Sequence, residues 1–250
     1  MLKNTKRTKI VCTLGPASEK EEVLTALIEN GLNVTRMNFS HGSHEEHKGR
    51  MDLVKKVREK LNKPVALLLD TKGPEIRTGN FDQPEVLLEE GQKFTITMKD
   101  VIGTKEICTV SYKGLANDVV AGDTILIDDG LVGLRVEEVN GDDILCIVEN
   151  SGIVKNHKGV NVPGVKINLP ALTDKDISDI EFGISQGIDF IAASFVRKVS
   201  DVLAIREVLE RNNATDIQII SKIENQEGVD NLDDIIAVSD GIMVARGDLG

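Results

Sequence analysis

Two acidic residues, Glu224 and Asp248, stand at the ends of two successive apolar stretches and could together hold a divalent cation. Mg2+ in proteins is commonly bound by one or two carboxylates and takes its other ligands from water and substrate. Lys222 lies just before Glu224 in the stretch IQIISKIE, where a solvated surface lysine would be unusual. Its ammonium suits a transferring phosphoryl group or an oxyanion, although a structural ion pair with Glu224 is the alternative. Either acid alone could cap a helix or pair with a base, but the two acids beside a lysine favour a metal site.

A second group of oxygen-bearing side chains contains a single acid. It consists of Asn38, Ser40, Asp70 and Thr71, which lie at the ends of the stretches NVTRMNF and PVALLLD. A weakly charged set of this kind suits a monovalent cation better than Mg2+, which prefers carboxylates and phosphates. A hydrogen-bonded cluster that stiffens two strand ends explains the same residues equally well.

Arginines and histidines stand near the same places. Lone arginines such as Arg36 and Arg77 most often form ordinary salt bridges, but two of them beside a metal site favour a polyanionic substrate. His41, His44 and His47 have a helical spacing that could indicate a metal site. Because they lie among glutamates on a polar helix face, we interpret them as solvated.

Six short apolar runs must position these residues. The runs are KIVCTLG, NVTRMNF, PVALLLD, DFIAASFV, IQIISKIE and GIMVARGD. Amphipathic patterns predict helices over residues 21–30, 43–62, 173–187 and 200–213. Continuous apolar strands that alternate with amphipathic helices predict a parallel sheet covered by helices. In a barrel of this type the strand ends converge on one face, where Ser194, Phe195 and Arg197 should join the residues above.

The alternation stops between residues 74 and 171. Here the stretches KFTITM, EICTVSY, TILIDDGLVGLRVEEV and DILCIVEN alternate with a period of two, and Asn140-Gly141 is a hairpin signal. The sequence therefore predicts an α/β fold, a partial (β/α)8 TIM barrel with about six of eight strands and an inserted all-β lid domain. Residues 1–73 form the first part of the barrel, 74–171 the inserted domain, and 172–250 the continued barrel, which we expect to be cut short.

Composition narrows the classes of partner. The formal net charge of −11 leaves no basic surface for a nucleic acid, and no run approaches the roughly 18 apolar residues of a membrane span. The start of the chain lacks the apolar segment and cleavage site of a secretory signal. Cys12, Cys108 and Cys146 resemble neither a disulfide framework nor a zinc site. We therefore expect a cytoplasmic protein with three buried thiols and with neither nucleic acid nor membrane as partner.

Five motifs in order closely resemble the pyruvate kinase family, in its bacterial form. They are VTRMNFSHG, LLDTKGPEIRTG, KGVNVPG, ISKIENQEGV and MVARGDLG, and the resemblance runs from about residue 8 to residue 250. It implies phosphoryl transfer from phosphoenolpyruvate to ADP, giving pyruvate and ATP in glycolysis. It also implies Mg2+ (or Mn2+) and K+ as cofactors and a homotetramer as the full-length form, with the inserted domain as its mobile lid.

The resemblance also assigns roles to individual residues. Lys222 and Arg36 correspond to catalytic residues, Glu224 and Asp248 to the Mg2+ ligands, and the group Asn38, Ser40, Asp70 and Thr71 to the K+ ligands. The nucleotide contacts correspond to Arg36, Asn38, His41, Arg77 and Lys158, and the substrate contacts to Lys222, Gly247, Asp248 and Arg36.

Two other functions fit part of the pattern. A magnesium-dependent lyase or aldolase barrel that forms an enolate also uses paired acids at strand ends, but it requires neither NFSHG nor an inserted β domain. A non-catalytic fragment is the third interpretation, and we expect the isolated 250-residue chain to be inactive.

Overall fold

The chain folds into two compact units, and the computed structural model describes residues 6–128 and 130–245. The first unit combines Met1–Gly73 with Ala171–Gly250, and the second is the intervening segment Pro74–Pro170. Each unit has a hydrophobic core of its own. The apolar side chains of each unit are therefore buried mainly by that unit's own elements.

The first unit is built on a sheet of six parallel strands. In spatial order they are β1 (Ile10–Thr13), β2 (Leu32–Asn38), β3 (Ala66–Asp70), β13 (Phe190–Ala193), β14 (Gln218–Ile223) and β15 (Gly241–Val244). Leu67, Leu68 and Leu69 are all buried, so β3 is covered on both faces. Within the described residues, β1 and β15 each pair with one neighbour only. The unit is thus an open, partial (β/α)8 barrel, as the sequence predicts.

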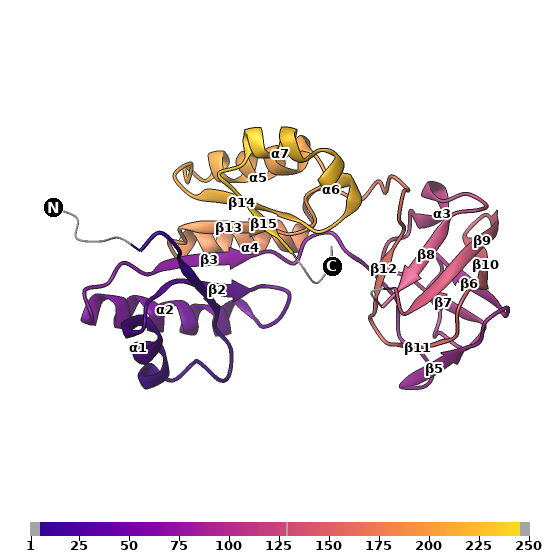
Figure 1. Ribbon diagram of the computed structural model, residues 1–250, viewed down its shortest axis with the longest axis horizontal. Coiled ribbons are helices and arrows are strands. Elements are labelled where there is room, and N and C mark those ends of the chain that lie inside the picture. Colours follow the sequence, from indigo (N-terminus) through magenta and orange to yellow (C-terminus); the bar gives the residue numbers. More distant parts are fainter. Residues whose placement is uncertain (1–5, 129, 246–250) are drawn as a thin grey trace. The chain divides into compact units, whose positions relative to one another are not determined.

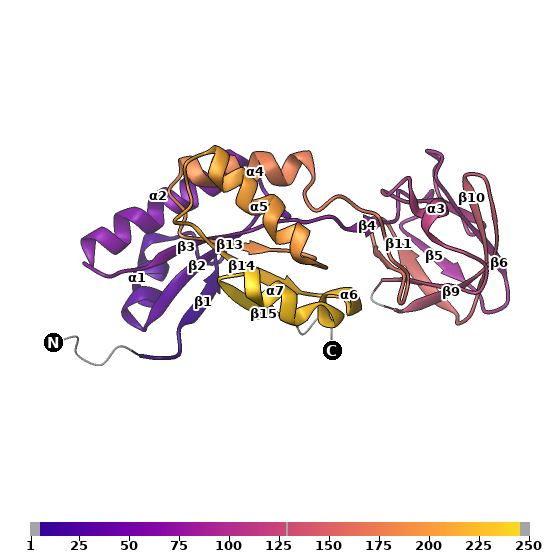
Figure 2. The ribbon, with the colours of Figure 1, turned by 90° about the horizontal axis from the view of Figure 1, so that it is seen from above.

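Helices connect the strands and pack against them (Figures 1 and 2). They are α1 (Glu21–Glu29), α2 (His44–Lys60), α4 (Asp174–Ser185), α5 (Val199–Arg211), α6 (Gln226–Asp230) and α7 (Leu232–Val238). Both views show α1 and α2 beside β2 and β3, and α5 and α7 beside β14 and β15. Leu24 of α1, Val54 of α2 and Val202 of α5 share one core with the strands, so these helices fix the positions of the strand ends.

The helices α2 and α4 both begin with a capping box. Ser43 Oγ accepts a hydrogen bond from the Glu46 N–H, and the Glu46 carboxylate accepts one from the Ser43 N–H. Thr173 and Asp176 form the same reciprocal pair at the start of α4. These capping boxes fix where each helix begins. α2 therefore starts directly after the segment that carries Asn38 and Ser40.

The described residues of the second unit form strands and one short helix, α3 (Leu115–Asp118). Its seven-stranded sheet has the order β4 (Ile76–Arg77), β12 (Gly159–Asn161), β8 (Thr124–Ile127), β9 (Val132–Asn140), β10 (Asp143–Val148), β6 (Lys93–Thr97) and β7 (Ile107–Thr109). β11 (Gly152–Lys155) pairs with β5 (Glu85–Leu88) in a second sheet. Phe94, Ile125 and Leu134 are among the buried side chains of its core. All of these elements lie between β3 and α4 in the chain.

Some details of the second unit differ from what the sequence indicates. The Asn140-Gly141 turn joins β9 to β10, as predicted, and Gly141 has a positive φ of 61°. The short strands β4, β5, β11 and β12 were not expected, because they lie outside the alternating stretches of the sequence. Among the described residues, no helix is long and apolar enough to cross a membrane.

The expectation of three buried thiols is wrong for one of them. Cys108 and Cys146 are buried in the second unit, and burial raises the pKa of each thiol to about 12. Cys12 is only partly buried, because β1 has a neighbour on one side alone among the described residues.

We expect residues 74–170, produced alone, to fold into a stable β domain, because the strands pair with one another around their own core. Circular dichroism should show a β-type spectrum, and chemical unfolding should be a single cooperative transition. Residues 172–250 alone serve as the control and should not unfold cooperatively, because the partner strands β1 to β3 are missing. A disordered spectrum for residues 74–170 would contradict this.

Candidate active site

The carboxyl ends of the parallel strands meet along one edge of the sheet. Strand register places Asn38 opposite Asp70, and Asp70 opposite Ala192. Ser194 follows β13 on this edge, and Lys222 lies near the end of the adjacent strand β14. The candidate residues of the first unit are therefore neighbours although they are distant in the sequence.

Asp70 is the centre of this cluster and is 1% exposed. One carboxylate oxygen accepts a hydrogen bond from Arg36 Nε at 2.5 Å. The other accepts from Ser194 Oγ at 3.1 Å and lies 3.2 Å from Lys222 Nζ. A buried carboxylate is costly unless it is paired and hydrogen-bonded, and here two cations and a hydroxyl meet that requirement.

Lys222 is also largely enclosed, with 11% of its side chain exposed. Its Nζ lies 2.8 Å from Ser194 Oγ and 3.0 Å from Glu224 Oε1, in addition to its contact with Asp70. The other oxygen of Glu224 accepts a hydrogen bond from the Phe195 N–H at 2.6 Å. The ion pair between Lys222 and Glu224 thus exists, but it belongs to a larger network at the edge of the sheet where a substrate would be bound.

Ser194 holds this network together, a role that the sequence did not reveal. Its N–H donates to Thr71 Oγ1 at 3.0 Å, and its own hydroxyl lies 2.7 Å from the Thr71 carbonyl. Gly73 passes so close that a Cβ on it would stand 2.8 Å from Ser194 Cβ, and its φ is +72°. The only signal in the sequence was the position of Ser194 directly after an apolar strand. Its contacts depend on the spacing between β3 and β13.

The neutral members of the second group lie around Asp70. Asn38 Oδ1 accepts a hydrogen bond from the Ser40 N–H at 3.1 Å, and the Phe39 N–H donates to the Asp70 carbonyl at 3.0 Å. Thr71 is 2% exposed, and its N–H donates to the Ala192 carbonyl. These contacts form the stiffening cluster that was one interpretation of the group, and they leave the monovalent-cation interpretation open.

The histidines correct the expectation of a solvated group. His41 is exposed, but His47 is 1% exposed and stacks on Phe39, with 4.0 Å between ring centroids. His44 is partly buried and lies 2.7 Å from Asp179 Oδ1. The prediction of solvated histidines failed because α4 packs against this end of α2, and the spacing of residues along α2 does not reveal that contact. Burial lowers the pKa of His47 below its ordinary value, so its ring is neutral near pH 7.

The remaining candidate residues belong to the second unit or lie outside the described residues. Arg77 makes two hydrogen bonds to Glu75, at 2.6 and 2.8 Å, and one to the His157 carbonyl. Lys158 lies 3.0 Å from Asp128. Gly247 and Asp248 lie outside the described residues.

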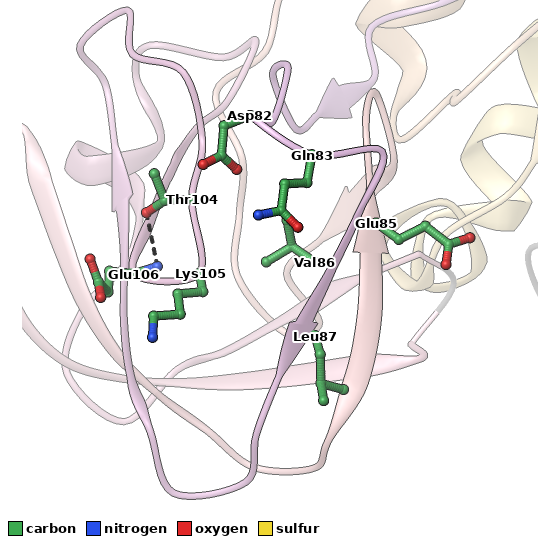
Figure 3. A pocket seen from close by; sticks show the side chains of 8 residues that line it. All are labelled: Asp82, Gln83, Glu85, Val86, Leu87, Thr104, Lys105 and Glu106. Carbon is green, nitrogen blue, oxygen red and sulfur yellow. Dashed lines mark hydrogen bonds between the residues drawn. The ribbon is translucent and has the colours of Figure 1, made fainter.

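The hollow shown in Figure 3 is a different place in the second unit. Asp82, Glu85, Leu87 and Lys105 are among the side chains that line it, and none of the predicted site residues does. Within residues 6–128 and 130–245, no three His, Cys, Asp or Glu side chains form a metal-binding group. The strand-end cluster, which links Arg36, Asp70, Lys222 and Glu224, is therefore the candidate site that we consider further.

Comparison with known proteins identifies the family that the sequence motifs resemble. A sequence model described as "Pyruvate kinase, barrel domain" matches residues 5–250. The chain belongs to the pyruvate kinase family. Proteins named pyruvate kinase from Clostridium acetobutylicum and Bacillus licheniformis are 61% and 60% identical to it, each over 98% of this chain. A third, from Staphylococcus epidermidis, is 58% identical over the same share. The chain spans about half the length of these relatives, 52% of the first and 42% of the other two.

The residues present fit the cations that this pyruvate kinase resemblance implies. A carboxylate that receives a backbone N–H on one oxygen, as Glu224 does, has the orientation typical of a metal-ligating acid. Asn38, Ser40 and Thr71 supply amide and hydroxyl oxygens together with a single buried acid, Asp70, so this donor set has a low charge. The first arrangement suits Mg2+ and the second a monovalent cation.

We expect Gly73→Ala to destabilise the fold by about 1–3 kcal/mol, because the new Cβ would meet the Ser194 backbone at a positive φ. Gly49→Ala is the matched control: nothing lies within 4 Å of the new Cβ in α2, so stability should be unchanged or rise by roughly 0.5–1 kcal/mol. Chemical unfolding of a version that spans the full length of the relatives measures both. Equal stability of the two variants would show that the close approach of Gly73 to Ser194 is not a constraint.

Proposed function

We propose that the protein transfers a phosphoryl group from phosphoenolpyruvate to ADP and produces pyruvate and ATP. The observation that carries this proposal is the Lys222 ammonium, held at the edge of the sheet within 3.2 Å of Asp70, Ser194 and Glu224. Phosphoryl transfer requires little covalent chemistry from a protein and depends on positioning and on stabilising charge. A cation fixed by three protein groups supplies the positioning and part of the positive charge.

The formal charges of the described cluster favour added cations. Arg36 and Lys222 are balanced by Asp70 and Glu224, so these four groups carry no net positive charge toward two polyanionic substrates. Glu224 with Asp248 would hold Mg2+, and Asn38, Ser40, Asp70 and Thr71 would hold K+. When bound, the two ions supply the positive charge that phosphoryl transfer between anions requires.

The side chains of this chain then divide the remaining work. Lys222 would lie along the path of the phosphoryl group, and Arg36, which also donates to Thr13 Oγ1, would contact phosphate oxygens. Gly247 and Asp248 would hold the substrate carboxylate through their backbone. The nucleotide contacts would come from Arg36, Asn38 and His41, and from Arg77 and Lys158 of the second unit. Closure of that unit as a lid would exclude water, which otherwise competes with ADP for the phosphoryl group.

Replacing Glu224 tests this proposal. In a version that spans the full length of the relatives, Glu224→Gln should lower kcat by about 100-fold or more and raise the Mg2+ concentration needed for half-maximal rate. Glu227→Gln, three residues further on, is the matched control and should keep both parameters near those of the parent. A coupled assay of pyruvate formation over a Mg2+ series measures them.

An unchanged Mg2+ curve in Glu224→Gln would remove this residue from the metal site. A parent protein that turns over an oxo-acid without any nucleotide would instead favour the enolate-forming lyase.

A polypeptide of these 250 residues alone should be inactive. The outer edges of β1 and β15 have no partner strand among the described residues, and Val11 and Val244 are 47% and 65% exposed there. Open edges and exposed apolar side chains favour association over a closed site. The same assay on the purified, monodisperse polypeptide should show no turnover. A rate within tenfold of an intact relative would contradict this.

A further inference from the structure

The segment between β2 and α2 is held by side chains from two helices. It contains Phe39, Ser40 and His41, and Ser40 belongs to the proposed K+ site. The carbonyl of His41 lies 2.8 Å from His47 Nε2, and the carbonyl of Phe39 accepts a hydrogen bond from Lys175 Nζ at 3.0 Å. The Phe39–Ser40 peptide and the His41–Gly42 peptide, one residue beyond Ser40, are thus held by residues that have no assigned role.

His47 is an unusual choice for a buried position. Its ring is stacked on Phe39 and 1% exposed, and its Nδ1 has no hydrogen-bond partner among the described residues. A phenylalanine would fill the same space without burying an unsatisfied polar atom. What the imidazole adds is one N–H, and the His41 carbonyl is the group that receives it. The lowered pKa of His47 keeps the ring neutral, with its proton on the nitrogen that donates.

Lys175 is oriented by Asp179 one turn further along α4. The two side chains form an ion pair at 2.5 Å, and the Asp179 side chain is 3% exposed. Asp179 also contacts His44 Nε2. The Lys175 ammonium is therefore held at a buried carboxylate, with a second hydrogen bond to the Phe39 carbonyl. Because the ammonium is fixed in this way, the Phe39 peptide is fixed as well.

We propose that His47 and Lys175 are positioning residues that set the geometry of Ser40, and so the affinity of the site for K+. This inference rests on the proposed function, since it deepens the assignment of the monovalent-cation site. Neither side chain contacts the cation; both act through the backbone. Removing a residue that orients a metal ligand without touching the metal typically weakens metal affinity by about 10–100-fold.

The test measures K+ activation in a version that spans the full length of the relatives, as the K+ concentration that gives half the maximal rate of pyruvate formation.

His47→Phe keeps the stacked ring and removes the donor, and Lys175→Met keeps the stem and removes the ammonium. Each should raise the K+ concentration for half-maximal rate by about tenfold, with an unchanged Mg2+ requirement. His47→Gln, which can donate from a similar place, should restore most of the K+ affinity. Lys48→Met is the matched control for Lys175→Met: it is the same substitution at an exposed lysine of α2 that pairs with Asp52, and it should leave the K+ affinity unchanged.

Thermal unfolding of each variant separates a structural role from a positioning role. A lower melting temperature with unchanged K+ affinity in both His47→Phe and Lys175→Met would overturn the inference and leave the proposed function intact. A parent that shows full activity without any monovalent cation would overturn the K+ assignment, and the inference with it. Lys175 is half exposed, so Lys175→Met gives a result even if His47→Phe does not fold.

Discussion

The buried carboxylate of Asp70 is the constraint on which the rest of the site depends. An acid that is 1% exposed requires positive charge and hydrogen bonds close by, and Arg36, Ser194 and Lys222 supply them from three other strands or their ends. Those strands must therefore lie in the observed order and register. Removing one partner from such a group leaves an uncompensated buried charge, which typically costs several kcal/mol. The cluster is thus both the candidate site and a constraint on the fold.

The second unit is inserted in the chain at a point that leaves the strand pairing around Asp70 intact. It leaves the sheet after β3 and returns before α4, yet β3 and β13 remain hydrogen-bonded neighbours. Gly73, the last residue before the second unit, donates its N–H to the buried Asp176 at 3.0 Å, and Asp176 also caps α4. The Asp176 carboxylate therefore binds the chain directly before the insertion, at Gly73, and shortly after it, at Thr173. The insertion adds residues such as Arg77 and Lys158 to the protein without interrupting the strand pairing around Asp70.

The sequence was most informative where periodicity is strong. All six parallel strands and the long helices could be predicted, because an apolar run or an amphipathic face is a local property. The candidate residues at the strand ends followed from the same pattern, since parallel strands present their carboxyl ends on one side. Four strands of the second unit were not predicted, because each has only two to four residues and, unlike β7 and β8, did not lie within a longer alternating stretch of sequence.

Properties that arise only from packing could not be predicted. His47 lies in a polar stretch of sequence but is buried, because Phe39 covers it and α4 lies close by. Ser194 looked like an ordinary strand end, and its contacts to Asp70, Thr71 and Lys222 depend on the spacing between strands. Asp248 lies outside the described residues, so its place beside Glu224 stays a prediction.

The most direct test of the account compares binding with turnover after the charge of Lys222 is removed. In Lys222→Met, within a version that spans the full length of the relatives, the proposed function predicts that kcat falls by roughly 100–1,000-fold, because the ammonium would act on charge that develops during phosphoryl transfer. The dissociation constant of phosphoenolpyruvate, measured by calorimetry with Mg2+ and K+, should change by less than about threefold if the interaction is made mainly in the transition state. A kcat within threefold of the parent would contradict the account, and so would a loss confined to substrate affinity.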